Sequence, residues 1–172
     1  MTMNDFTDCK STIEKISEDT EHKVTMSDNK TECFNFDKVK DKYLRNIHFH
    51  GFLCSSVDGL LLHNGKSYFI EFKNGALNYT SKTNAIRFKI KASVIIYCDI
   101  ADKHISDMRK TDEFILVYNE EKSKYVIAKY FTKKAGNEFI RFGLERYDGL
   151  YFKSVHTYTE KEFEKFMDEL QK

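Results

Sequence analysis

No stretch of this sequence approaches the ~18 consecutive apolar residues that a membrane-spanning helix requires. Residues 1–5 are polar and acidic, and they lack the basic start and apolar core of a signal peptide. No CxxC pair is present, because the four cysteines are widely scattered, at Cys9, Cys33, Cys54 and Cys98. That spacing argues against a zinc site or a disulfide framework. We therefore expect a cytoplasmic protein with reduced thiols and no membrane partner.

The chain also has no proline, no internal repeat and no low-complexity segment. With 172 residues it is long enough for one domain with a substantial core. Charged residues make up 32% and hydrophobic residues 41%, which are ordinary proportions for a soluble globular protein. We divide the chain into a polar, flexible N-terminal segment at 1–33 and a single domain at 34–172.

The formal net charge is only +1, but the charges are unevenly distributed. Residues 1–33 hold eight acidic residues against four lysines. Between residues 63 and 91 the only acid is Glu71, and the basic residues are Lys66, Lys73, Lys82, Arg87, Lys89 and Lys91. A phosphodiester substrate would need positive charge of this kind beside its site. Taken one by one, these lysines are better explained as a solvated helix face.

A tight β-hairpin is predicted at Asn64-Gly65, which lies between two apolar runs. A type I′ turn needs positive φ at both central residues, and Asn-Gly is the strongest sequence signal for it. If these residues form the turn, His63 pairs with Lys66, and the same register places Asp58 directly opposite Glu71. Directly opposed residues on antiparallel strands share a face of the sheet, with their Cβ atoms about 4.5–5.5 Å apart, and like charges at such a pair are destabilising. A divalent cation between the two carboxylates would turn that cost into a binding site.

Periodicity predicts the other elements. Lys73 follows Glu71 by two residues and shares its face of the strand. Ser93–Tyr97, at the end of the second predicted helix, is β-branched enough to form a strand by itself. Helices are expected at 36–46 with Asn35 as N-cap, from Thr80 or Ser81 to about Tyr97, and after a capping box of Thr159 and Glu162, while strands are expected at 113–118, 125–131 and 150–158.

The acidic residues of the hairpin resemble the signature of the PD-(D/E)XK nuclease superfamily, the restriction-endonuclease-like fold. Asp58 matches the first acid of that signature, and Glu71-Phe72-Lys73 matches its acidic-x-Lys element. Val57 replaces the proline of the name, a position that carries no chemistry. The resemblance implies an α/β (α+β) fold with an αβββαβ core. Its central mixed β-sheet would be flanked by helices, with C-terminal strands and a helix added to it.

The resemblance also implies a chemistry. Asp58, Glu71 and the backbone carbonyl of Phe72 would bind Mg²⁺, with Mn²⁺ as an alternative. Lys73 would orient or deprotonate the attacking water, or stabilise charge in the transition state. Further roles are weaker expectations: a phosphate contact from Arg87 or Lys91, and an additional acid from Glu14, Asp37 or Asp41.

Two other interpretations stay open. Asp58, Glu71 and Lys73 can form an ordinary surface salt-bridge cluster, which contributes little to stability. The surrounding strands look buried, however, and buried charge without a purpose is costly. The main rival is a catalytically silent restriction-like fold that binds nucleic acid or protein, as in a defence or mobile-element system. For the nuclease we expect a nucleic-acid substrate, with DNA first, and a homodimer if both strands are cut.

Overall fold

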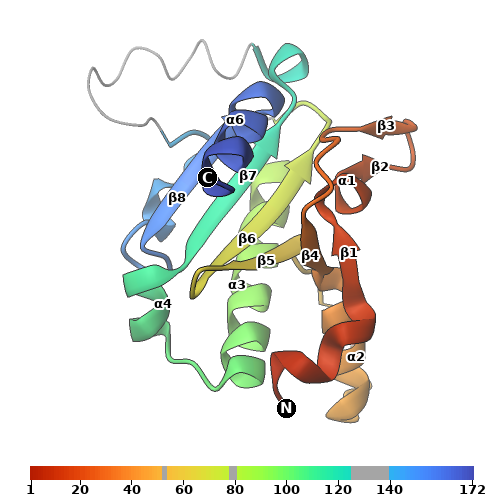
Figure 1. Cartoon of the computed structure of the whole chain (residues 1–172), viewed down its shortest axis with the longest axis vertical. Coiled ribbons are helices and arrows are strands. Elements are labelled where there is room, and N and C mark those ends of the chain that lie inside the picture. The colour runs from red at the N-terminus through yellow and green to blue at the C-terminus, as the bar shows by residue number, and fades with distance from the viewer. Residues whose placement is uncertain (52–53, 78–80, 125–139) are drawn as a thin grey trace.

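A six-stranded mixed β-sheet with helices on both faces forms the centre of the molecule (Figure 1). This computed structural model describes residues 1–51, 54–77, 81–124 and 140–172. The order of strands in the sheet is the order of these strands in the chain: β1 (Lys10–Thr12), β4 (Glu32–Asn35), β5 (Gly59–His63), β6 (Lys66–Lys73), β7 (Glu113–Tyr118) and β8 (Ser154–Thr159). A separate two-stranded sheet pairs β2 (Glu18–Asp19) with β3 (Val24–Thr25). The predicted α/β class with a central mixed sheet is confirmed.

The β5–β6 hairpin has the predicted turn and register. Asn64 and Gly65 have φ values of 50° and 74°, as a type I′ turn requires. His63 pairs with Lys66, and the ladder continues to Gly59 opposite Ile70. Beyond the hairpin, β6 pairs with β7 in parallel and β7 with β8 in parallel, whereas β1, β4, β5 and β6 pair antiparallel.

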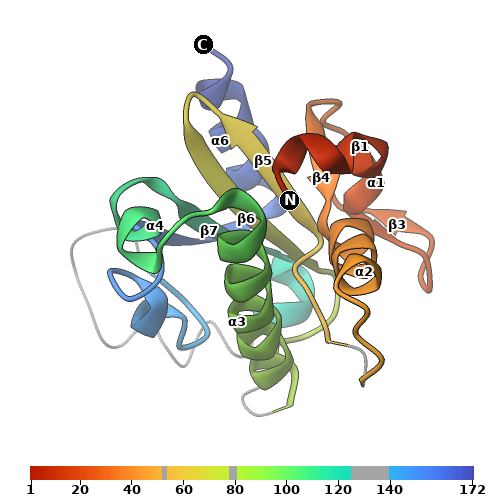
Figure 2. The same ribbon diagram turned by 90° about the horizontal axis from the view of Figure 1, so that it is seen from below.

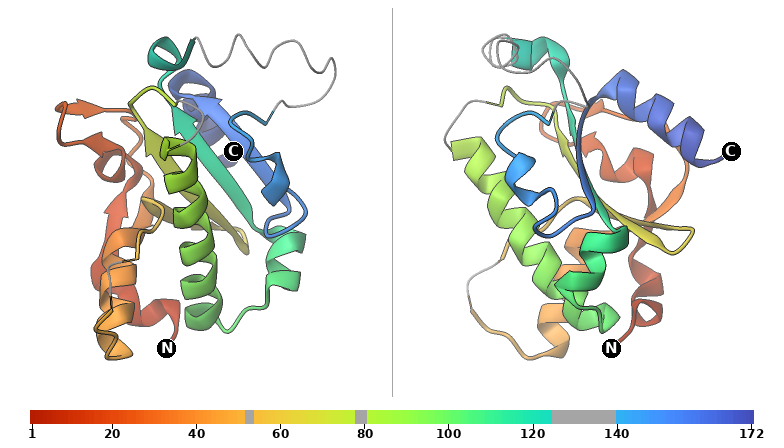
Figure 3. Two further views of the ribbon diagram at one scale, coloured as in Figure 1. Left: turned by 180° about the vertical axis from the view of Figure 1, so that it is seen from behind. Right: turned by 90° about the vertical axis from the view of Figure 1, so that its left-hand side faces the viewer.

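Two layers of helices cover the sheet, and the right-hand view of Figure 3 shows α3 and α6 on its opposite sides. Figure 2 shows α2 and α3 lying side by side on one of these faces. The helices whose bounds lie within the described residues include η1 (Met3–Cys9), α1 (Ile13–Ile16), α2 (Phe36–Asn46), α3 (Ser81–Ala101), α4 (Ile105–Thr111), η2 (Glu145–Tyr147) and α6 (Glu160–Leu170). The predicted caps are present, because Asn35 accepts a bond from the Lys38 amide and Thr159 forms a capping box with Glu162.

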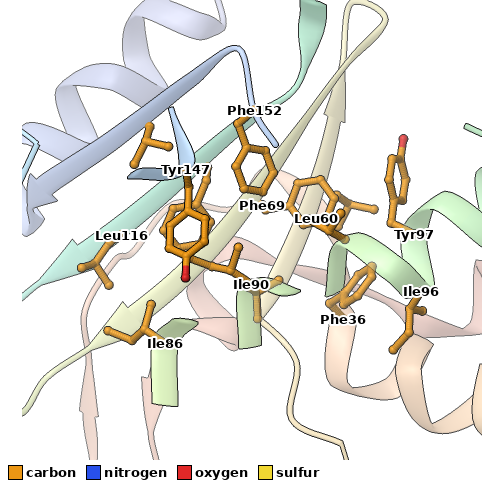
Figure 4. Close-up of a cluster of buried hydrophobic side chains, with 14 of the residues drawn as sticks. Phe36, Leu60, Phe69, Ile86, Ile90, Ile96, Tyr97, Leu116, Tyr147 and Phe152 are labelled. Carbon is orange, nitrogen blue, oxygen red and sulfur yellow. The ribbon is translucent and has the colours of Figure 1, made fainter. Parts of the chain in front are cut away.

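Alternation along β6 decides which side chains reach each layer. Tyr68, Ile70 and Phe72 pack in the cluster beneath α1 and α6. Phe69 points the other way, into the larger cluster with Phe36, Leu60 and Ile90 (Figure 4). Glu71 is on the same face as Phe69, so the sheet places its carboxylate in the apolar layer beneath α3.

The helix expected from Thr80 or Ser81 to about Tyr97 is confirmed as α3, which continues to Ala101, so the alternative strand at Ser93–Tyr97 does not form. Two predictions need correction. Residues 1–33 are part of the domain, since β1 is the edge strand of the main sheet and Phe6, Cys9 and Ile13 are buried. In the last expected strand, β8 begins at Ser154 rather than at Leu150.

Two further points concern the expected core. Between α2 and α3 the described residues contain two strands, β5 and β6, and the neighbouring β4 precedes α2. The αβββαβ order is therefore not reproduced element by element. The strand expected at 125–131 lies outside the described residues.

In the part of the chain that the structure describes, no helix combines the length and the apolarity needed to cross a membrane.

Candidate functional site

Asp58 lies immediately before β5, and its side chain, rather than its backbone, bonds across to β6. Its backbone carbonyl accepts a bond of 3.0 Å from the amide of Phe36, which ties it to the start of α2. Its Oδ2 accepts a bond of 2.7 Å from the amide of Phe72. The N–H and C=O of one strand residue point the same way, so the Phe72 carbonyl also faces the Asp58 side of β6. The structure therefore brings together Asp58 and the Phe72 backbone, as the sequence predicts.

Glu71 is fully buried, with 0% of its side chain exposed. Its Oε1 lies 2.7 Å from the Lys73 Nζ and 2.8 Å from the Lys89 Nζ. Both ammonium groups therefore pair with the same carboxylate oxygen. Its Oε2 accepts a bond of 3.0 Å from Lys89. Burying a carboxylate is costly, and these two lysines offset part of that cost.

Lys89 of α3 joins the two acids. Its Nζ lies 3.0 Å from Asp58 Oδ1 as well as within reach of both Glu71 oxygens, and its side chain is only 18% exposed. The Lys73 ammonium pairs with Glu71 but not with Asp58 among the described residues, and its side chain is more open, at 28%. The site is thus a cluster of two carboxylates and two ammonium groups, which we call the charged quartet: Asp58, Glu71, Lys73 and Lys89.

Burial and neighbouring charges shift the protonation of the charged quartet. The pKa of Glu71 is raised to about 7, first by burial and then by the Asp58 carboxylate, against the lowering effect of Lys73 and Lys89. Burial alone would lower the pKa of Lys89, but the charges of Glu71 and Asp58 raise it above its ordinary value. Lys89 therefore stays protonated at neutral pH, whereas the Glu71 carboxyl is poised near neutrality.

A cleft of about 410 Å³ opens beside the charged quartet, lined by Asp58, Phe72 and Lys73 together with residues of the N-terminal segment. Figure 1 shows the end of β6 next to the β2–β3 hairpin, which supplies that wall. Asp19 of this hairpin accepts bonds of 3.0 Å from Asn74 Nδ2 and 2.9 Å from the His22 ring. The pKa of Asp19 is lowered to about 2, chiefly by the Asn74 hydrogen bond. Residues 18–22 are thus part of the site's surroundings, which no local pattern in the sequence indicates.

The three further acids that the sequence suggested form contacts away from the charged quartet. Glu14 of α1 forms an ion pair with Lys30. Asp37 accepts from Ser56 Oγ at 2.6 Å and pairs with Lys40 at 3.2 Å, and Asp41 pairs with the same lysine at 3.3 Å. These partners lie outside the charged quartet.

Arg87 and Lys91 lie on the other flank of α3 from Lys89. Both line a second cavity, away from the carboxylates. The sequence puts all three basic residues beside the buried stripe of Ile86 and Ile90. Which flank faces the hairpin depends on how α3 crosses the sheet, which periodicity does not give.

The donors fit a hard divalent cation. Mg²⁺ usually binds through one or two carboxylates, waters and substrate oxygens rather than a complete protein cage. Asp58, Glu71 and the Phe72 carbonyl provide such a set, with both Glu71 oxygens at present paired to lysines. No group of three or more His, Cys, Asp or Glu suited to a metal occurs among the described residues. The Lys89 ammonium has the charge and position of a cation between the acids, so a metal would have to displace it.

Comparisons of the chain with protein-family models, with curated proteins and with solved structures give no significant match. The functional argument therefore depends on the geometry of the charged quartet and its cleft.

Proposed function

We propose that this protein is a Mg²⁺-dependent nuclease that hydrolyses phosphodiester bonds of nucleic acid, with DNA as the expected substrate. The observation that carries the proposal is the meeting of Asp58, buried Glu71 and Lys73 at the ends of two adjacent strands, beside a cleft. Perturbed carboxylates in a cleft are typical of functional sites. The order, spacing and face of these residues also resemble the PD-(D/E)XK signature.

Each residue has a role in this proposal. Asp58, Glu71 and the Phe72 carbonyl hold the metal ion. When bound, the ion neutralises phosphoryl charge and lowers the pKa of water. Of the two lysines in the charged quartet, Lys73 is the one that lines the cleft, so it reaches the substrate and positions the water or the phosphate. Asp58 is fixed through its bond to the Phe72 amide, which preorganises the carboxylate.

The setting of the enzyme is also a proposal. The four cysteines are free thiols, which supports a reducing, cytoplasmic location. A single site cuts one strand, so double-strand cleavage would require a homodimer.

The test is calorimetric titration with Mg²⁺ and Mn²⁺, followed by a plasmid-nicking assay on the same samples. Asp58→Asn should abolish both metal binding and nicking. The matched control is Asp107→Asn, which removes an exposed carboxylate of α4 that pairs with Lys110. If the wild type binds neither metal, or if Asp58→Asn nicks as well as the wild type, the proposal is wrong.

A second candidate function has its own support. Lys89 neutralises both acids without any metal, as in a restriction-like fold that has become a catalytically silent binding module. Lys89→Met separates the two functions. A nuclease site should bind Mg²⁺ more tightly after the change, because the competing ammonium is gone. A silent module should lose stability and still show no metal binding.

A further inference from the structure

The second cavity on α3 combines aromatic rings with positive charge. It measures about 500 Å³ and lies between the outer flank of α3 and the segment that follows η2. We call it the aromatic–basic pocket and define it by Arg87, Phe88, Lys91, Arg146, Tyr147 and Tyr151. No acidic residue lines it among the described residues. This composition selects an anionic ligand that also has flat apolar faces.

Phe88 is the most unusual member of the aromatic–basic pocket. Its side chain is 67% exposed, although burying a phenylalanine is strongly favourable. Leu150 across the pocket is also exposed, at 47%. The exposed ring leaves a flat apolar face open to a ligand, with the cations of the pocket around it.

The opposite wall of the pocket is rigid. Tyr147 is buried in the core beside Ile86 and Ile90 (Figure 4), and the Tyr151 ring stacks on it with centroids 5.7 Å apart. The Leu150 carbonyl accepts a bond of 2.8 Å from Arg109 Nε, which fixes the turn. The Tyr151 ring is therefore held in place, and it faces the pocket that Phe88 borders.

The cations of the pocket come from both of its walls. Arg87 Nη1 donates to Asn84 at 3.0 Å, and its Nε is buried with no hydrogen-bond partner among the described residues. Arg146 Nε donates to the Gly143 carbonyl at 3.0 Å, and Lys91 is exposed. Burial raises the pKa of Tyr147, while the nearby charges of Arg87 and Arg146 oppose that rise. Both guanidinium groups therefore lie close to the base of the pocket.

We infer that the aromatic–basic pocket binds single-stranded nucleic acid, with a base against Phe88 and phosphates on Arg87, Lys91 and Arg146. Proteins that bind single strands combine stacking rings with a positive groove. A duplex hides the faces of its bases, so the exposed ring favours an unpaired strand. The inference deepens the proposed nuclease function by naming its substrate class. The pocket lies across α3 from the charged quartet, and a helix with its side chains is about 10–12 Å thick.

The test is fluorescence anisotropy with a labelled 20-nucleotide oligothymidine in EDTA, where cleavage cannot occur. Phe88→Ala should weaken binding about tenfold or more, which corresponds to the loss of one stacked base. Lys91→Ala should reduce the slope of log affinity against log salt by about 0.7. Ile95→Ala is the matched control, since Ile95 is 66% exposed on the same helix but lies outside the pocket.

Several results would overturn the inference. These are no binding by the wild type, equal weakening by Ile95→Ala and Phe88→Ala, or a blunt duplex that binds as tightly as the single strand. Polyglutamate that competes as well as unlabelled oligothymidine would also overturn it, because the pocket would then recognise charge alone. Binding in EDTA is independent of Asp58, so Asp58→Asn separates a failure of this inference from a failure of the nuclease proposal.

Discussion

The burial of Glu71 should make the stability of this fold depend on pH between about 4.5 and 7. Its carboxyl has a pKa of about 7 in the folded protein, against an ordinary value of 4.5. The folded state therefore binds this proton more tightly than the unfolded state does. Stability from this group is complete below pH 4.5 and is lost as the pH rises through 7. The difference corresponds to about 3 kcal/mol of unfolding free energy, at about 1.36 kcal/mol per tenfold change in proton affinity.

Glu71→Gln isolates this contribution, because glutamine has nearly the same shape and does not titrate. Urea unfolding in EDTA at several pH values between 4.5 and 8 gives the free energy of unfolding of both proteins. The wild type should lose about 3 kcal/mol relative to Glu71→Gln across that range. Asp107→Asn is the control. The difference in unfolding free energy between the wild type and Asp107→Asn should not change with pH above pH 5, because the hydrogen bond from Lys110 lowers the pKa of Asp107.

Parallel pH profiles for wild type and Glu71→Gln would refute the reasoning. They would mean that the Glu71 carboxylate is solvated or fully compensated by the lysines in solution. Adding Mg²⁺ gives a second check on the wild type, because a metal binds the deprotonated carboxylate. The metal should raise the unfolding temperature more at pH 8 than at pH 5.5.

Other substitutions probe single features of the structure. Lys89→Met leaves Glu71 and Asp58 without their shared counter-ion. It should lower the free energy of unfolding by about 3 kcal/mol at pH 8. The loss should be smaller at pH 5.5, where Glu71 takes up a proton, and urea unfolding at the two pH values measures both. Gly65→Ala places a Cβ on a residue with φ of 74°, and thermal unfolding should show a loss of about 1 kcal/mol. Thr159→Ala removes the cap of α6 and should cost about 1 kcal/mol in the same assay.

Local signals predicted most of the described elements. Asn64-Gly65 fixed the hairpin register, because a two-residue turn leaves no freedom in which residues pair. Asn35 and Thr159 marked helix starts, since capping depends only on neighbours in the chain. The proximity of Asp58, Glu71 and Lys73 followed from the hairpin register and from the alternation of side chains along a strand, since all three belong to one hairpin.

Contacts between distant segments could not be predicted in this way. Lys89 reaches the acids because α3 crosses the sheet at a particular angle. Periodicity does not show whether Lys89 or its neighbours Arg87 and Lys91 would face them. Asp19 borders the cleft through Asn74, 55 residues away, and its polar surroundings in the sequence suggested a loose segment. β1 joins the sheet through main-chain pairing with β4, which leaves little trace in side-chain pattern.

The agreement between strand order in space and in the chain has a consequence for biosynthesis. Each strand of the main sheet pairs with the strand of that sheet made just before it, so the sheet can grow by addition as the chain emerges. The β5–β6 hairpin brings Asp58 and Glu71 together first. Lys89 follows Glu71 by 18 residues, so the two acids meet before their counter-ion has been made. The nascent hairpin must hold its acids in water, or protonated, until α3 forms and carries the lysine onto them.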